Sequence, residues 1–171
     1  MTPNIRSRAI RIPLMHISFR DNLEGVWKPL PPAGGELVAG KYPEPATPRV
    51  SVAPDIVSCF RGVYPNVSKF FEEKNYPHMD FFVYEPVFEG SERVWTPEIL
   101  TKHQLVWDAH VTNEHAILDR VKMKLIGEVR IYNTNKEPTA TTHPFNNPNE
   151  PEQSIGPKNI RVVWLSPTQK E

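Results

Sequence analysis

The clearest strand signal in the chain is the run VKMKLIGEVRI at residues 121–131. Its odd positions are mostly apolar, and Lys122, Lys124 and Arg130 stand between them. Successive side chains of a strand point to opposite faces, so this alternation predicts one buried face and one face toward water. Gly127 predicts a bend within the strand. The residues expected on the buried face are Val121, Met123, Leu125, Val129 and Ile131.

Shorter strands are expected on both sides of this run. A first strand is expected over residues 10–19, and its apolar residues change parity near Pro13, which predicts a bulge or a crossing between sheets there. Residues 49–52 and 81–88 are rich in β-branched and aromatic side chains, which favours two more strands. A last strand is expected at residues 160–165.

Helices are expected to be short. The chain contains 19 prolines, and a proline inside a helix removes a backbone donor and clashes with the preceding turn. One helix is expected to begin at Ala53-Pro54-Asp55 and to bury a stripe that includes Phe60. A second is expected over residues 66–73, and a third begins at Thr96-Pro97-Glu98.

Length and composition favour one domain with extensions. At 171 residues the chain has room for a single ordinary hydrophobic core. We expect a core domain at residues 1–132, an arm rich in proline and asparagine at 133–158, and a final strand and tail at 159–171. Residues 27–48 are expected to form a long loop. The predicted fold class is α+β, with two small, mostly antiparallel sheets, short flanking helices and an extended C-terminal arm.

Charge and cysteine content limit the partners and the compartment. Twenty basic residues balance 20 acidic ones, so no net field favours non-specific binding of nucleic acid. Arginines do cluster near the N-terminus, where a solvated surface is the simplest interpretation. Cys59 is the only cysteine, which fits a reducing cytoplasmic compartment and a buried, unreactive thiol. No apolar run is long enough for a membrane span, so no membrane partner is expected. The arginines that cluster near the N-terminus are Arg6, Arg8, Arg11 and Arg20.

The densest polar cluster lies at residues 107–115. The nucleophile-elbow, phosphate-loop, dinucleotide and HExxH patterns are absent from the chain, which excludes the enzyme classes that depend on them. If the cluster is extended, alternate side chains share one face and could bind zinc or iron. A third ligand would have to come from the distant His16 or His103, so a hydrogen-bonded polar edge is favoured and no metal is expected. The residues on that face would be Asp108, His110, Thr112 and Glu114.

Three other polar residues are expected to face away from the apolar layer. With Ile17 turned inward, the alternation of the first strand places His16 and Ser18 together on the opposite face. Ser51 has the same position between two inward valines of the next strand. Ligands usually bind in clefts lined by a few polar groups from several elements. These three residues are therefore candidate binding residues.

The order of these segments resembles that of small bacteriophage proteins, which are in turn distantly similar to the ADP-ribosyltransferase and RNA 2′-phosphotransferase fold. The resemblance covers roughly residues 10–132. It depends on four pieces of sequence. These are LMHIS at 14–18, TPRVSVAPDI at 47–56 with Cys59, FVY at 82–84, and TNE at 112–114 ahead of the long strand.

The resemblance implies a role for each candidate residue. His16 would hold the ribose of NAD, Ser51 would border the nicotinamide pocket, and Ser18 would line the same cleft. Glu114 would be the catalytic residue and would orient the reacting hydroxyl. The chain departs from the family pattern because no glycine follows His16 and no second glutamine or glutamate stands two residues before Glu114. These departures favour binding of a nucleotide over turnover, and they leave open whether the protein is an enzyme.

Two functions follow as expectations. The first is a phage-encoded accessory protein of host takeover, with an ADP-ribosyltransferase-like cleft for NAD or another nucleotide, acting in the host cytoplasm. The second is a non-enzymatic interaction protein, either a virion component or an inhibitor of a host factor. In that case a host or phage protein would bind the arm at residues 133–158, whose composition is too polar to form a core by itself.

Overall fold

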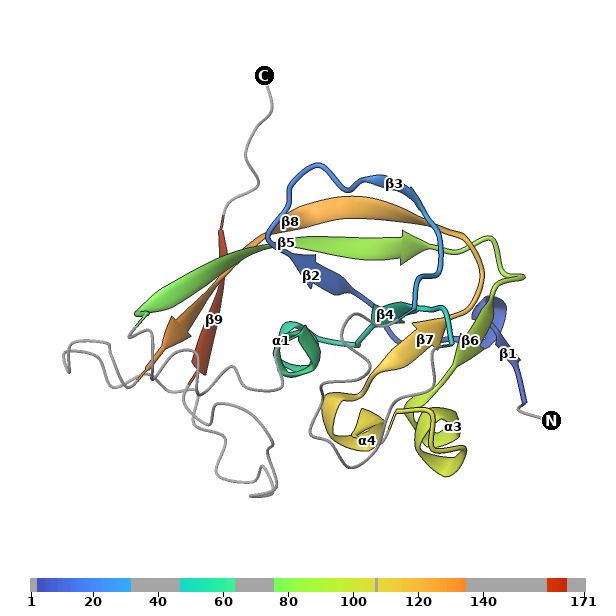
Figure 1. The fold of residues 1–171 in the computed structure, drawn as a ribbon. Helices are drawn as coiled ribbons and strands as arrows, with labels where there is room; N and C mark the ends of the chain where they lie inside the picture. Colours follow the sequence, from blue (N-terminus) through green and yellow to red (C-terminus); the bar gives the residue numbers. More distant parts are fainter. Residues whose placement is uncertain (1–2, 32–46, 64–75, 107, 135–159, 166–171) are drawn as a thin grey trace.

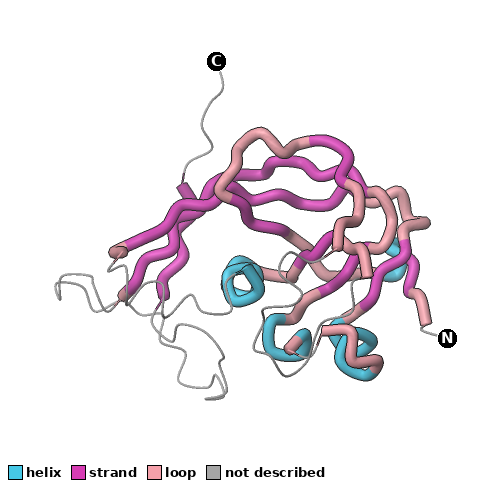
Figure 2. Tube along the Cα trace, in the orientation of Figure 1, coloured by secondary structure: helices cyan, strands magenta, loops and turns pink. Residues whose placement is uncertain are grey.

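Two antiparallel sheets and a few short helices make up the fold (Figures 1 and 2). The computed structural model describes residues 3–31, 47–63, 76–106, 108–134 and 160–165. This arrangement agrees with the predicted class of two small, mostly antiparallel sheets with short helices. None of the described helices is long and apolar enough to cross a membrane.

The larger sheet is built around one long antiparallel ladder. Strands β5 and β8 form its centre, β2 lies beside β5, and both β3 and β9 pair with the other edge of β8. In Figure 1 these long strands curve over the rest of the described structure. The bounds are β2 His16–Ser18, β3 Gly25–Trp27, β5 His78–Val87, β8 Val121–Asn133 and β9 Ile160–Leu165.

The smaller sheet has the order β1-β6-β7-β4. It is joined to the larger one where Met15 and Ala53 exchange backbone hydrogen bonds of 2.8 and 2.9 Å. This junction brings the start of β2 next to the end of β4, which positions the candidate site. The bounds are β1 Ile5–Arg6, β4 Val50–Val52, β6 Arg93–Trp95 and β7 His115–Ile117.

Short helices cover both sheets. Helix α1 (Ile56–Val63) packs under the larger sheet, where Phe60 contacts the ring of Phe81. Helices α3 (Pro97–Lys102) and α4 (Ala109–Thr112) cover the smaller sheet (Figure 1). A 3₁₀ turn at Ser7–Ala9 follows β1.

The long strand of the opening prediction is present, but it does not have a single buried face. Val83 of β5 pairs with Gly127, whereas Tyr84 pairs with Leu125, so Ile126 forms a bulge in β8. An extra residue reverses the alternation beyond it. The expectation of burial is confirmed for four of the five odd-numbered residues, and Leu125 is half-buried, but the expectation of one face is wrong. Val121 and Met123 belong to one core cluster, and Val129 and Ile131 belong to another.

The intervening charges lie as predicted only in part. Lys122 and Lys124 are exposed, which confirms the register of this half of β8. Arg130 is half-buried and forms a bidentate ion pair with Asp80 on the neighbouring strand, at 2.7 and 2.8 Å. The ion pair allows a charged side chain to lie partly against the sheet.

The first predicted strand is shorter than expected. Only His16–Ser18 forms a ladder, and Ile12 is exposed. The change of parity nevertheless marks a crossing, as predicted. Leu14 packs in the same core cluster as Met123, whereas Met15 and Ile17 pack with the other cluster.

The remaining expectations are mostly confirmed where the structure describes the chain. The strands expected at 49–52, 81–88 and 160–165 correspond to β4, β5 and β9, and two of the three helices to α1 and α3. Strands β1, β3, β6 and β7 were missed, because two or three residues are too few to show alternation. The helix expected at 66–73 and nearly all of the arm at 133–158 lie outside the described residues, as does most of the loop expected at 27–48.

Cys59 is buried in α1, as predicted. Its Sγ donates to the backbone oxygen of Met15 at 3.2 Å, and burial raises the pKa of the thiol to about 12. Because only the thiolate is a good nucleophile, we expect native protein to react with an aromatic disulfide reagent far more slowly than protein unfolded in denaturant. Absorbance of the released thiol measures both rates. Fast reaction of the folded protein would contradict the burial of this side chain.

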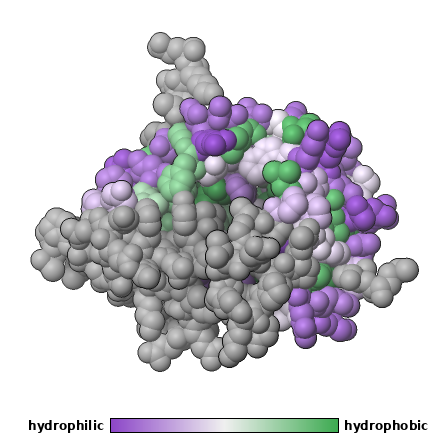
Figure 3. Space-filling view, viewed as in Figure 1, coloured by the Kyte–Doolittle hydropathy of each residue, from purple (hydrophilic) through white to green (hydrophobic). Residues whose placement is uncertain are grey.

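Large apolar side chains that stay exposed are scattered over the described surface. On the face shown in Figure 3, the hydrophobic areas are separated by hydrophilic ones. Isolated exposed apolar residues are normal and mark no interface by themselves. They are Ile12, Phe19, Val26, Leu30, Tyr76, Val87 and Trp164.

Candidate functional site

A chain of hydrogen bonds joins three of the predicted site residues. The Nδ1 atom of His16 lies 2.9 Å from the backbone oxygen of Ser51. The hydroxyl of Ser51 donates to Oε1 of Glu114 at 2.6 Å. Arg49 donates to the same carboxylate oxygen from Nε at 3.2 Å. Residues from three distant segments therefore meet at one place.

Pairing of β4 with β7 explains this meeting. Val50 and Val52 are buried, so alternation turns Arg49 and Ser51 to the other face of the strand. Ser51 pairs with Ala116 of β7. Glu114 stands two residues before Ala116 and so shares its parity, which places the carboxylate beside the serine.

A left-handed turn directs the chain into this position. Asn113 ends α4 with a φ of 53°, a conformation that asparagine tolerates better than most residues. Its side-chain amide donates to Oγ of Ser58 at 3.2 Å. Asp55 in turn accepts from the backbone and hydroxyl of Ser58 at 2.7 and 3.1 Å, which caps α1. The capped helix thus anchors the residue that precedes Glu114.

The surroundings of His16 favour its neutral imidazole form. Burial lowers its pKa below the ordinary value, although the hydrogen bond to Ser51 opposes this effect. A carbonyl oxygen can only accept, so the proton is on Nδ1 and Nε2 is left as an acceptor. Within the described structure Nε2 forms no hydrogen bond. This nitrogen is also not fully buried, so it can be reached from outside. The ring of Trp27 flanks the imidazole at 4.9 Å, nearly perpendicular to it.

The ion pair between Arg49 and Glu114 is largely buried. Together with His16 and Ser51 these residues form the candidate site. The side chains of Arg49 and Glu114 are 6 % and 15 % exposed. Removing a charge from water is costly unless an opposite charge and hydrogen bonds compensate. Arg49 supplies the opposite charge and Ser51 a hydrogen bond, so both kinds of compensation reach the Glu114 carboxylate.

Ser18 stands outside this chain of hydrogen bonds. Its hydroxyl oxygen accepts from the backbone of Arg20 at 3.2 Å, and the residue pairs with Phe82. It lies on the same side of β2 as His16, as alternation predicts. Its hydrogen bond is to a residue two positions away. Ser18 therefore lies on the same face as His16 but is not part of the contact between His16 and Ser51.

The condition for a shared polar face at residues 107–115, an extended backbone, is not met. Residues 109–112 form α4, in which neighbouring side chains are about 100° apart, so alternate residues do not share a face. His110 is exposed, and only Glu114 reaches the cluster. In the part of the chain that the structure describes, no three or more His, Cys, Asp or Glu side chains are grouped to hold a metal.

Arg49 and Trp27 were missed as site residues. Arg49 shares the parity of Ser51, which was a usable signal, but an arginine at the start of a strand is ordinarily a surface residue. Trp27 gave no such signal because it lay in the expected loop. Its position beside His16 depends on the pairing of β3 with β8, which its own sequence does not reveal.

The chain matches no known protein family, no curated protein and no solved structure. Its function therefore has to be inferred from the chemistry of the cluster. Within the described residues, that chemistry comprises an imidazole acceptor, a carboxylate that accepts from Arg49 and Ser51, a buried guanidinium and an adjacent indole.

Proposed function

We propose that His16, Arg49, Ser51 and Glu114 form the polar part of an ADP-ribosyltransferase-like cleft that binds NAD or a related nucleotide. The observation that supports this most is the hydrogen-bond chain from His16 through Ser51 to Glu114. Alternation predicted the outward positions of His16 and Ser51, the family resemblance added Glu114, and no regular element contains more than one of these three residues.

The available acceptor matches the chemistry of a ribose. A neutral imidazole can accept a hydrogen bond from a sugar hydroxyl through Nε2. The indole of Trp27 beside it provides an apolar surface, as ligand sites usually combine aromatic walls with few polar groups. A hydroxyl-rich, ring-containing ligand suits this combination better than a free anion does.

If transfer occurs, its chemistry is the following. The bond between C1′ of the nicotinamide ribose and the pyridine nitrogen breaks, and nicotinamide leaves with the bonding electron pair. C1′ then bonds to an oxygen or nitrogen of the acceptor, whose proton passes to solvent. Glu114 would stabilise the positive charge that develops on the ribose, since a fixed carboxylate in a site shielded from water is most effective there.

Ligand-dependent stabilisation tests the binding step. NAD or ADP-ribose should raise the melting temperature, because a ligand that binds only native protein stabilises it by about 2.7 kcal/mol at a hundredfold excess over its Kd. The shift should shrink in His16→Ala, which removes the Nε2 acceptor. His110→Ala is the matched control, since this histidine is exposed on α4 and should leave the shift unchanged.

Glu114→Gln separates binding from turnover. Glutamine keeps the size and can still accept from Ser51, so the thermal shift should survive. Transfer of ADP-ribose or hydrolysis of NAD should fall by about a hundredfold or more, because the charge is lost. If no nicotinamide or adenine nucleotide shifts the melting temperature of the unaltered protein, the proposal fails, and an interaction protein becomes the better interpretation.

A further inference from the structure

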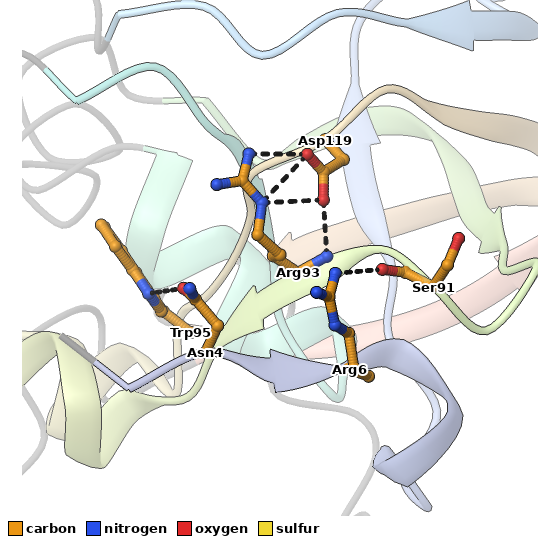
Figure 4. Close-up of polar contacts among 6 residues, drawn as sticks. All are labelled: Asn4, Arg6, Ser91, Arg93, Trp95 and Asp119. Atoms are coloured by element: carbon orange, nitrogen blue, oxygen red, sulfur yellow. Dashed lines mark hydrogen bonds and ion pairs between the residues drawn. The ribbon is translucent and has the colours of Figure 1, made fainter.

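Arginines gather at the corner of the smaller sheet farthest from Ser51, at the β1 edge. Four of them are exposed, and the side chain of the fifth, Arg93, is 43 % exposed. Figure 4 shows part of this corner, with Arg6 and Arg93 side by side on neighbouring strands. We call this group the arginine corner. Its members are Arg6, Arg8, Arg11, Arg93 and Arg120.

Two of these side chains are directly opposed in the sheet. Arg6 of β1 pairs with Arg93 of β6, and like charges opposite each other destabilise an antiparallel pair. Asp119 forms a bidentate ion pair with Arg93 at 2.7 and 3.1 Å, and it attracts Arg6 at longer range. Arg6 donates to a neutral acceptor, the backbone oxygen of Ser91, at 2.8 Å. One carboxylate thus lies close to two opposed guanidinium groups, and only Arg93 forms an ion pair with it.

The other arginines also lack a carboxylate partner in the described structure. Arg11 donates to the backbone oxygen of Arg8 at 2.8 Å, which holds these two residues together, and Arg120 directly follows Asp119. No ion pair involves any of these three side chains within the described ranges.

Nearby carboxylates do not neutralise the corner. Glu92 is buried, where it accepts from Ser7 and from the backbone of Glu89 and Gly90. Asp119 is bound to Arg93. Among residues 89–93, Glu89 is therefore the exposed carboxylate that remains. Five guanidinium groups thus face three carboxylates, an excess of two positive charges at one corner of a chain with no net charge.

We propose that the arginine corner binds the phosphate backbone of single-stranded nucleic acid. Guanidinium forks match phosphate oxygens in a bidentate geometry, and all the cations here are arginine. Trp95 lies two residues from Arg93 on the same face of β6, with Nε1 bonded to Asn4 at 2.9 Å (Figure 4). Its ring packs partly against the core cluster of Leu100 and Ala116, and the rest of the side chain is accessible. An aromatic ring beside arginines is the usual means of stacking an unpaired base.

An acidic protein surface fits the corner less well. Protein interfaces normally have an apolar centre surrounded by polar residues. The arginine corner has little exposed apolar surface. Of the exposed large apolar side chains on the described surface, only Ile12 is next in sequence to one of the five arginines. The balance of charge over the whole chain does not oppose the proposal, because salt screens charges beyond about 8 to 10 Å and binding depends on the local group.

Binding of labelled oligonucleotides tests the proposal. Fluorescence anisotropy of short fluorescein-labelled single-stranded RNA and DNA should report binding at about 50 mM salt, with an affinity that falls as salt rises. In Arg6→Gln/Arg120→Gln, which leaves the Arg93–Asp119 ion pair intact, Kd should rise at least about tenfold. The slope of log K against log salt should fall by about 0.7 for each phosphate group that the variant protein no longer neutralises.

Arg20→Gln/Lys124→Gln is the matched control, since it removes two exposed cations that are not members of the corner and should leave Kd nearly unchanged. The proposal is overturned if the unaltered protein binds neither oligonucleotide at low salt, or if the control loses as much affinity as the arginine variant. It is also overturned if fluorescein-labelled polyglutamate binds as tightly as the oligonucleotides, because the corner would then suit an acidic protein. The arginine corner and the NAD site share no residue, so either proposal can fail alone.

Discussion

Replacing Met123 with alanine should lower the free energy of unfolding by about 2 to 5 kcal/mol. The side chain is fully buried in the core cluster that also contains Val121 and Tyr84. Its neighbours across the sheet are Gly25 on one side and Pro86 on the other. Gly25 and Pro86 have no flexible side chain to move into the cavity, so any relaxation has to come from the rest of the core cluster. Urea denaturation followed by circular dichroism measures the change.

Two further truncations serve as controls for this prediction. Leu125→Ala should cost less, because its side chain is only partly buried. Val26→Ala on the edge strand β3 should change stability by less than about 0.5 kcal/mol, since Val26 is 66 % exposed. If Met123→Ala cost no more than Val26→Ala, the register of β8 against β3 and β5 would be wrong.

Alternation in a long strand could be read from the sequence, but a bulge could not. The lysines of β8 revealed its register because charged side chains avoid the core. Ile126 gave no signal of its own, since an apolar residue next to Gly127 suits several backbone arrangements. The bulge exists only relative to β5, and pairing between distant segments is not encoded in either segment alone. The same reason hid β6 and β7, whose short sequences became strands through their partners.

The candidate site was predictable to a similar degree. Local alternation was enough to place Ser51 and His16 on non-core faces. The role of Glu114 came from the family resemblance, and its segment is helical at 109–112, so alternation could not have placed it. A four-residue helix is set by its packing rather than by its propensity. Arg49 could be recognised only after β4 and β7 were paired, because its role depends on the carboxylate brought to it.

Replacing Arg49 with methionine should destabilise the protein by about 3 to 5 kcal/mol. The change removes the cation from a carboxylate that is only 15 % exposed, and water cannot replace the guanidinium fully at such a site. Methionine preserves most of the side-chain volume, so the loss reflects the charge more than a cavity. Arg93→Met is the comparison, because its ion pair with Asp119 is 43 % and 34 % exposed and should contribute about 1 kcal/mol or less.

The double variant Arg49→Met/Glu114→Gln identifies the cause of that loss. Glutamine can still accept from Ser51 and needs no cation, so the double variant should recover much of the stability lost in Arg49→Met alone. A double-mutant cycle measures this coupling between Arg49 and Glu114. A cost in Arg49→Met that the second change does not recover would instead indicate lost packing around the arginine stem. Recovery would show that Arg49 holds Glu114 in its ionised form beside Ser51, and ADP-ribosyl transfer would require the carboxylate in that form.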